Sequence, residues 1–316
     1  MKITVLDDYQ SVALRCADWS VLDADIETLP RHIDDQDELA RVLADADVVV
    51  AMRERTPLPA ALLERLPKLR LLVTTSTRNA SIDMDAAAVL GIAVCGTRGT
   101  KASTIEHTWA LILALLRNIP AEQQSLRDGG WQRGIGSCLA GKYLGLLGLG
   151  SIGGKVARIA DAFDMRPIAW STNLTKQRAE ECGARLVSKE ELLRTADIVS
   201  IHLVPGDRNR GLIGAGELAM MRPESFLVNT SRASIVDTAA LVDALRAGTI
   251  AGAAVDVFDT EPLPADHPLL HAPNTVLTPH LGYVTLDGYR VFYGDVVEDI
   301  AGWIAGSPVR VLNDPS

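Results

Sequence analysis

The sequence predicts an α/β protein whose parallel sheets are covered by helices on both faces. Two observations carry this prediction. Short apolar runs alternate with helical patterns along the chain, which is typical of parallel strands joined by crossover helices. A glycine-rich turn, GLGSIG at 148–153, also follows one apolar run and opens a helical pattern. At 316 residues the chain is long enough for about two domains.

The N-terminal part of the chain predicts one small α/β domain. Its expected strands are 3–6, 26–29, 48–51, 71–74 and 92–95, and its expected helices are 37–44, 60–66 and 82–90. Gly91 follows the last of these helical patterns, where a glycine commonly ends a helix.

A strongly apolar helix is expected next, over 104–116. Ser103 and Glu106 match the S-x-x-E pattern of a capping box, and the residues that follow are apolar on nearly all sides. Such a helix must be buried, and we expect it at the interface between two domains. Glu106 and His107 are therefore interpreted as first-turn residues rather than catalytic groups.

The alternation resumes after a polar, glycine-rich segment at 127–142. Strands are expected at 143–147, 167–170, 185–187, 198–203, 226–229, 251–258 and 275–277, and helices at 153–163, 189–195, 215–220 and 237–247. They predict a doubly wound sheet of Rossmann type. A final amphipathic helix runs from Leu286 to Ile304, and 308–312 is an expected edge segment.

The bulk properties narrow the class of protein. A net charge of −9 with a pI near 5.2 argues against nucleic acid or an acidic membrane as a partner. The four cysteines show no metal-ligand spacing, so we expect no metal site and a reducing compartment. The apolar run 109–116 is far shorter than the roughly 20 residues of a membrane span. The expectation is a soluble, cytoplasmic protein.

The glycine turn predicts a dinucleotide site. Gly148 permits the tight turn, Gly150 lets the backbone approach a pyrophosphate, and Gly153 allows close packing of the helix on the strand. The N-terminus of the following helix offers free N–H groups to the phosphates.

Polar groups follow several later strands, where ligands bind in an open parallel sheet. Arg232, Glu261 and His280 supply a guanidinium, a carboxylate and an imidazole. Arginine binds a carboxylate by two parallel hydrogen bonds, and histidine can donate a proton near neutral pH. This set suits the reduction of a 2-oxo acid, although spacing alone does not show that the three groups meet.

Four segments in register resemble the D-isomer-specific 2-hydroxyacid dehydrogenase family, within its phosphoglycerate dehydrogenase-like members. They are GLGSIG at 148–153, NTSRASIVD at 229–237, VDVFDTEPLP at 255–264 and TPHLGYVT at 278–285, supported by IEHT at 105–108 and SIHLVP at 200–205. The resemblance implies two Rossmann-like lobes. A coenzyme domain, 102–285, would be inserted into a smaller flavodoxin-like substrate domain formed by 1–101 and 286–316.

The resemblance also implies roles for single residues. Arg232 would hold the substrate carboxylate and carbonyl, His280 would protonate the carbonyl oxygen, and Glu261 would hydrogen-bond His280. Coenzyme contacts are expected from the residues Gly148, Gly150, Ser151, Ile152, Gly153, Ser171, Thr172, Asn173, His202, Val204, Pro205, Thr230 and Asp256. Asp256 would contact the nicotinamide carboxamide, whereas the place of His202 inside a strand favours a structural role. Substrate contacts are expected from Arg53, Ser76, Thr77, Arg78 and Tyr283.

Two departures from the family pattern affect specificity. The acid expected about 20 residues after the glycines is absent, because Ser171, Thr172 and Asn173 stand there. The coenzyme therefore stays open between NAD and NADP, with Lys176 and Arg178 as the nearest cations. Tyr283 stands where many members carry glycine, and its ring would narrow or line the substrate pocket.

The sequence therefore predicts an NAD(P)-dependent 2-hydroxyacid dehydrogenase that interconverts a 2-oxo acid and a D-2-hydroxy acid. Two alternatives remain at this point, a non-catalytic coenzyme-sensing module of the corepressor kind and a formate dehydrogenase-like enzyme. The latter is disfavoured because we expect a longer N-terminal segment in that branch. The resemblance and the apolar helix at 104–116 predict a homodimer.

Overall fold

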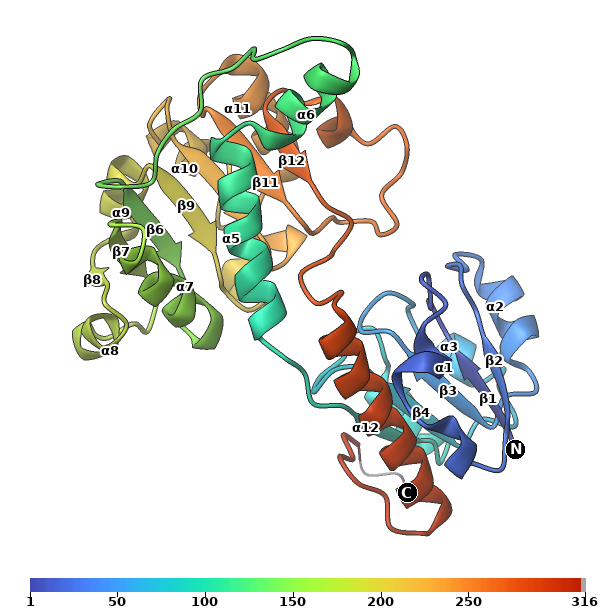
Figure 1. Ribbon diagram of the computed structural model, residues 1–316. Helices are drawn as coiled ribbons and strands as arrows, with labels where there is room; N and C mark the ends of the chain where they lie inside the picture. The colour runs from blue at the N-terminus through green and yellow to red at the C-terminus, as the bar shows by residue number, and fades with distance from the viewer. Residues whose placement is uncertain (314–316) are drawn as a thin grey trace. The chain divides into compact units, whose positions relative to one another are not determined.

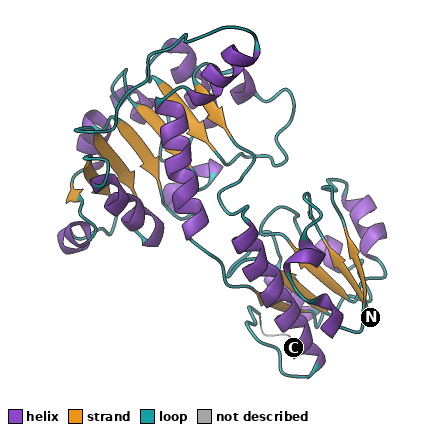
Figure 2. Cartoon of the chain, in the orientation of Figure 1, coloured by secondary structure: helices purple, strands orange, loops and turns teal. Residues whose placement is uncertain are grey.

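The computed structural model describes residues 1–313 and shows two compact units. One unit comprises Met1–Thr100 together with the C-terminal stretch that begins at Val284, and the other is Lys101–Tyr283. Helices cover both sheets (Figure 2). Positions 314–316 of the expected substrate domain lie outside the described residues.

The first unit is built on a sheet of five parallel strands in the order β2-β1-β3-β4-β5. The strands are β1 (Lys2–Val5), β2 (Asp25–Thr28), β3 (Val48–Ala51), β4 (Leu71–Thr74) and β5 (Ala93–Gly96). This is the flavodoxin-like order, as the sequence predicts. Strands β3, β4 and β5 are buried along their whole length, because helices on both faces leave no solvated side.

The helices of the first unit are α1 (Ala13–Cys16), α2 (Gln36–Leu43), α3 (Ala60–Leu63), α4 (Met84–Val89) and α12 (Leu286–Ile304), with a short 3₁₀ turn at Trp19–Val21. Leucines of α2 and α3 form one core with the sheet. The long C-terminal helix α12 packs against α1, β4 and β5. Of the expected edge segment 308–312, only Val311 pairs with the sheet, in an isolated antiparallel bridge to Cys95, and the Leu312 amide donates to the Val94 carbonyl at 2.7 Å.

The second unit is a sheet of seven parallel strands in the order β12-β11-β10-β9-β6-β7-β8 (Figure 1). The strands are β6 (Tyr143–Leu147), β7 (Arg166–Trp170), β8 (Arg185–Leu186), β9 (Ile198–Ile201), β10 (Phe226–Asn229), β11 (Gly252–Val255) and β12 (Thr275–Leu277). The order reverses beside β6, which makes this a Rossmann sheet with one added strand. The predicted fold class of two Rossmann-like lobes is confirmed.

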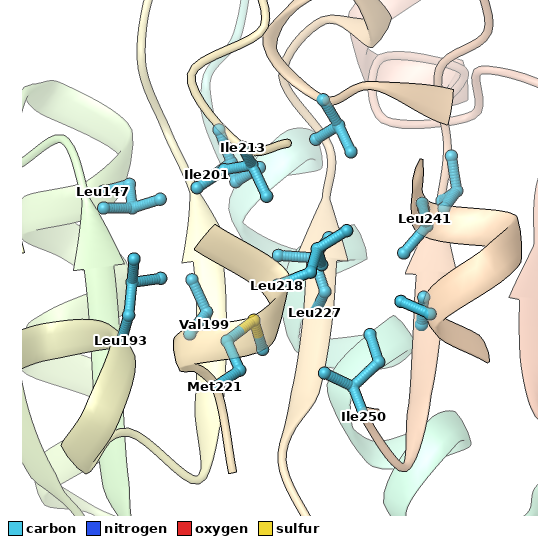
Figure 3. Close-up of a cluster of buried hydrophobic side chains, with 14 of the residues drawn as sticks. Leu147, Leu193, Val199, Ile201, Ile213, Leu218, Met221, Leu227, Leu241 and Ile250 are labelled. Atoms are coloured by element: carbon cyan, nitrogen blue, oxygen red, sulfur yellow. The ribbon is translucent and has the colours of Figure 1, made fainter. Parts of the chain in front are cut away.

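Two hydrophobic cores lie on the two faces of the seven-stranded sheet. The first joins the strands to α9 (Lys189–Thr195), α10 (Ala215–Met220) and α11 (Thr238–Ala247). Figure 3 shows Leu193, Leu218 and Leu241 of these helices beside strand residues such as Val199 and Leu227. The second core joins the sheet to α5 (Ala102–Leu116), α7 (Ser151–Asp161) and α8 (Lys176–Glu181).

The start of α5 differs from the predicted capping box. The helix begins at Ala102, with Lys101 at the cap position and no side-chain cap. Ser103 is therefore inside the first turn, and its buried hydroxyl has no hydrogen-bond partner among the described residues. The capping-box prediction was wrong because Ser103 was already a helical residue.

The apolar face of α5 is used within its own unit. Trp109, Ile112 and Leu116 belong to the second core, and α5 lies against α7 and strands β10 to β12 (Figure 1). The strong apolarity of this helix is thus accounted for by the seven-stranded sheet that it covers.

The sequence analysis missed three helices, the four-residue α1 and the longer α6 (Ile119–Arg127) and α8. Asn118, with a left-handed φ of 54°, separates α6 from α5, so two helices follow each other almost without a loop. Few residues of either longer helix are buried, Ser125 in α6 and Ala179 in α8. Without an apolar stripe, neither helix had the periodicity that identifies one.

Among residues 1–313, no helix is both long and apolar enough to cross a membrane.

Candidate active site

The glycine turn between β6 and α7 forms an open cradle. Gly148 has φ of +98°, and a Cβ there would lie 2.6 Å from the His202 carbonyl oxygen. A Cβ on Gly153 would overlap the Gly148 carbonyl oxygen. By contrast, a Cβ on Gly150 would meet nothing within 4 Å, and Gly150 caps α7 without a side chain. Free N–H groups of the first turn, where Ser151 and Ile152 lie, thus face open space, which fits a pyrophosphate.

His202 lies directly behind the cradle, after β9. Its Nε2 is 3.0 Å from the Ser200 hydroxyl, and loss of surrounding water lowers its pKa to about 4. The imidazole is therefore neutral at pH 7. His202 directly follows β9 and is not inside a strand, so the strand position expected from the sequence was wrong. Val204, farther along the same loop, is 75% exposed, and Pro205 is exposed as well, so both can contact a ligand.

The loop after β10 carries Arg232. The Asn229 side chain donates to the Arg232 carbonyl at 3.0 Å, and the Arg232 guanidinium donates to the Ser231 carbonyl at 2.9 Å. Thr230 is buried, with its hydroxyl 2.9 Å from that of Thr108 in α5. These bonds hold the loop so that a half-buried guanidinium stands at the carboxyl end of the sheet.

Glu261 and His280 form a close pair. Glu261 Oε2 lies 2.6 Å from His280 Nδ1, and Glu261 Oε1 accepts from the Phe258 amide at 2.9 Å. Since the carboxylate accepts from Nδ1, the other ring nitrogen, Nε2, is left for a ligand. The edge of the Tyr283 ring meets the imidazole at 5.3 Å between centroids and 74° between planes. The buried Tyr283 therefore packs against the acid–base candidate itself.

Asp256 organises the turn that carries His280. The carboxylate is 1% exposed. It accepts from the Thr278 hydroxyl at 2.6 Å, from the Leu281 amide at 2.7 Å and from the Gly282 amide at 2.9 Å. His107 Nε2 lies 3.1 Å from the same carboxylate. With about four acceptor sites on a carboxylate, these groups use its whole capacity.

The sequence analysis did not find two members of this network. His107 was interpreted as a first-turn residue, and Thr278 received no role. His107 Nε2 is in fact 3.1 Å from the Thr278 hydroxyl and from Asp256. The signal available was the IEHT segment of the family resemblance, because no local pattern reveals a partner so distant in the sequence.

The sheet order places these groups in a row. His280, Asp256 and Arg232 follow β12, β11 and β10, which are neighbours in the sheet. At about 4.8 Å between adjacent strands, the strands before His280 and Arg232 are about 10 Å apart. A small acid is shorter than this gap, so contact of its carboxylate with the guanidinium and of its carbonyl with the imidazole requires both side chains to extend toward each other.

The end of β7 lies on the other side of the cradle. Ser171 is half-buried, Thr172 and Asn173 are exposed, and the Leu174 amide closes the turn on the Ser171 carbonyl at 3.1 Å. Two hydroxyls and an amide thus stand where many dinucleotide sites carry an acid.

The predicted substrate residues of the first unit gather at the carboxyl ends of β3 and β4. Arg53 has a left-handed φ of 52°, and its amide donates to the Thr75 hydroxyl at 3.0 Å. Asn79 donates to the Arg53 carbonyl. The loop also contains Ser76, Thr77 and Arg78, the last of which donates its amide to the Ser76 hydroxyl at 3.3 Å. Hydrogen bonds with Thr75 and Asn79 therefore fix the strained backbone of Arg53. Backbone strain of this kind is often found at ligand sites.

Comparison with known proteins identifies related chains. Residues 109–282 match the family model described as "D-isomer specific 2-hydroxyacid dehydrogenase, NAD binding domain". A glyoxylate reductase of Aeropyrum pernix is 45% identical over 234 residues, which are 71% of this chain and 70% of that enzyme. A crystal structure of a phosphoglycerate oxidoreductase from Vibrio cholerae has 34% identity and a TM-score of 0.93, covering 97% of this chain and 99% of that one.

A third relative differs in length. The D-3-phosphoglycerate dehydrogenase of Archaeoglobus fulgidus is 33% identical along 100% of this chain, yet the match spans only 60% of that enzyme. The present chain is thus similar to part of that protein.

Proposed function

Because the chain belongs to the D-isomer specific 2-hydroxyacid dehydrogenase family, we propose that it reduces a small 2-oxo acid to the D-2-hydroxy acid with NADH or NADPH. Residues 109–282 form the NAD-binding domain of that family. The observation that carries the proposal is the Glu261–His280 pair, with 2.6 Å between Oε2 and Nδ1. It lies at the carboxyl end of the sheet, where Arg232 also lies. In this proposal the enzyme acts in the cytoplasm.

The proposed chemistry assigns one task to each group. Bound NADH or NADPH would supply the hydride that C2 of the 2-oxo acid receives. As the carbonyl oxygen gains charge, His280 Nε2 gives it a proton, while Glu261 accepts a hydrogen bond from Nδ1 and fixes the orientation of the ring. Arg232 pairs with the carboxylate and polarises the carbonyl. In the opposite direction the neutral His280 takes the hydroxyl proton, so the same groups serve both directions.

Further contacts complete the proposal. We assign substrate binding to Arg53, Ser76, Thr77 and Arg78, which rests on their place at strand ends and on the family resemblance. Tyr283 touches His280 and is assigned both the orientation of the imidazole and the limit on substrate size.

The substrate is proposed to be a two- or three-carbon acid. A relative that is 45% identical is named a glyoxylate reductase, and a buried tyrosine ring beside His280 leaves less space than glycine would. Glyoxylate and hydroxypyruvate are therefore the first candidates, ahead of phenylpyruvate and branched 2-oxo acids.

We further propose that two copies of the chain associate through α6 and the segment after it. Ile119, Leu126, Trp131 and Ile135 are 52%, 59%, 72% and 98% exposed. Four large apolar side chains exposed within one short stretch are typical of a protein interface. The apolar residues of α5, by contrast, are buried in their own unit.

The test is a matrix of NADH and NADPH against glyoxylate, hydroxypyruvate, pyruvate and phenylpyruvate, read as coenzyme oxidation, together with the chirality of the product. We expect turnover with the small acids and a D product from hydroxypyruvate and pyruvate, since the product of glyoxylate, glycolate, is achiral. An Arg232→Ala variant should lose turnover and still bind coenzyme. A wild-type chain that binds coenzyme and turns over none of these acids would overturn the proposal in favour of a coenzyme sensor.

A further inference from the structure

We infer that this chain prefers NADPH to NADH, and that Arg178 is the residue that recognises the 2′-phosphate. The inference deepens the proposed function and rests on its coenzyme site. Three observations support it: where the Arg178 guanidinium lies, what stands at the end of β7, and how weakly the guanidinium is held.

Arg178 reaches the helix that opens the dinucleotide cradle. It lies in the first turn of α8, whose Thr175 cap accepts from the Arg178 amide at 3.2 Å. An ideal Cβ on Gly154, in the first turn of α7, would be 3.3 Å from Arg178 Nη2 and 2.9 Å from Cys182 Sγ. The absence of a side chain at Gly154 therefore lets α8 pack closely on α7. As a result, the guanidinium lies near Gly154, one residue past the glycine turn at 148–153.

The adenosine ribose, whose 2′-oxygen carries the phosphate in NADP, lies at the end of the second strand of a Rossmann sheet. That strand is β7, the neighbour of β6, and Ser171, Thr172 and Asn173 follow it. A carboxylate at this place binds the ribose hydroxyls and repels a phosphate, which selects NAD. These three residues place no carboxylate at the end of β7, and their side chains can donate hydrogen bonds to a phosphate.

The guanidinium can be released to a phosphate. Arg178 Nη1 is 3.6 Å from Glu181 Oε2, and the two side chains are 42% and 50% exposed. An exposed pair of this kind contributes little to stability. A phosphate accepts two parallel charge-assisted hydrogen bonds from a guanidinium and is the stronger partner. Lys176, on the same helix, forms an exposed pair with Glu180, with 3.8 Å between Nζ and Oε1, so this cation is also weakly held.

The experiment measures binding without any acid substrate. Calorimetric titration compares NADPH with NADH, and adenosine 2′,5′-bisphosphate with 5′-AMP, on the full chain. We expect the compound with the 2′-phosphate to bind about 10-fold tighter in each pair, and more weakly as salt is raised. Arg178→Gln should remove this preference and leave the binding of NADH and 5′-AMP unchanged.

The matched control is Arg158→Gln. Arg158 also bridges α7 and α8, since its Nη2 donates to the Glu181 carbonyl at 3.3 Å, but it lies two turns into α7. This variant should keep the preference. If Arg178→Gln proves unfolded by circular dichroism, Ser171→Asp gives an independent test, because a carboxylate after β7 should reverse the preference.

Each outcome decides the inference. The inference is overturned if the wild type binds NADH as tightly as NADPH or more tightly. It is also overturned if Arg178→Gln lowers the affinity for NADH as much as the affinity for NADPH. A chain that prefers NADPH but reduces no 2-oxo acid would refute the proposed function and leave the coenzyme assignment intact.

Discussion

His107 Nε2 lies 3.1 Å from Asp256 Oδ1, although 149 residues separate the two in the chain. This contact joins the first turns of α5 to the carboxylate that also holds the Leu281 and Gly282 amides. His280 lies between Thr278 and Leu281, so the position of the proposed acid depends on a helix from a distant part of the sequence.

Replacing Asp256 by asparagine should disturb this turn. The amide group brings a donor toward backbone N–H donors, and an unpaired buried donor costs about 1–3 kcal/mol. We expect kcat to fall by about 100-fold, with coenzyme binding changed far less. Stopped-flow turnover and coenzyme titration separate the two effects. The exposed Asp266→Asn serves as control, and unchanged kcat in Asp256→Asn would contradict the positioning role.

Glu261→Gln tests the partner of His280. Glutamine keeps the shape of the side chain but removes the negative charge 2.6 Å from the imidazole. The Nδ1–H then loses its charged acceptor, which orients the ring, and we expect kcat to fall by roughly 100-fold with unchanged affinity for coenzyme. The exposed Glu224→Gln should behave as the wild type. Equal kcat in the two variants would show that Glu261 does not assist His280.

Two glycine variants should separate coenzyme binding from folding. The Cβ of Gly150→Ala projects into open space, so this variant should fold normally and bind coenzyme at least about 10-fold more weakly. The Cβ of Gly153→Ala would overlap the Gly148 carbonyl, and the cost of overpacking is about 1–3 kcal/mol. Thermal unfolding and coenzyme titration of both variants give the answer, and an unstable Gly150→Ala would refute the open cradle.

Asp299 should make the stability of the first unit depend on pH. Burial, and repulsion by Asp295 and Glu298, raise its pKa to about 7 despite the attraction of Arg310. Between pH 4 and 7 the folded chain therefore binds one more proton than the unfolded chain. As pH rises through this window, the free energy of unfolding should fall by up to about 1.4 kcal/mol per pH unit from this group.

Asp299→Asn provides the comparison for this effect. Asparagine keeps the oxygen that accepts from Arg310 Nε at 3.0 Å and does not titrate. Urea unfolding between pH 4.5 and 8 should show that the variant gains stability relative to the wild type as pH rises. A constant difference across that range would mean that Asp299 is ionised throughout.

The exposed apolar side chains of α6 and the segment after it predict that substitutions there prevent dimer formation. Trp131→Ser combined with Ile135→Ser should convert a dimer into a monomer, measured by light scattering on a sizing column. These side chains are 72% and 98% exposed in a single copy, so their loss should not destabilise the copy itself. Val89→Ser, which removes an apolar residue 80% exposed in the first unit, should leave the dimer intact. A monomeric wild type would refute the proposal.

The sequence by itself determined the strands and the glycine cradle. Buried parallel strands are continuous apolar runs, so Val48–Ala51, Leu71–Thr74 and Phe226–Asn229 were predicted to the residue. Gly148 and Gly153 could be assigned because a local backbone geometry requires glycine. Each of these features depends on residues that are near one another in the chain.

Only the tertiary structure decided which side chains meet. The contact of Asp256 with His107 and the closeness of Arg178 to Gly154 of α7 join elements that no periodicity relates. The raised pKa of Asp299 likewise comes from burial and from the charges around it. A sequence pattern reflects interactions between residues that are close along the chain. Hydrogen bonds and desolvation depend instead on residues that are close in space, and the packing of helices on the sheets determines which residues these are.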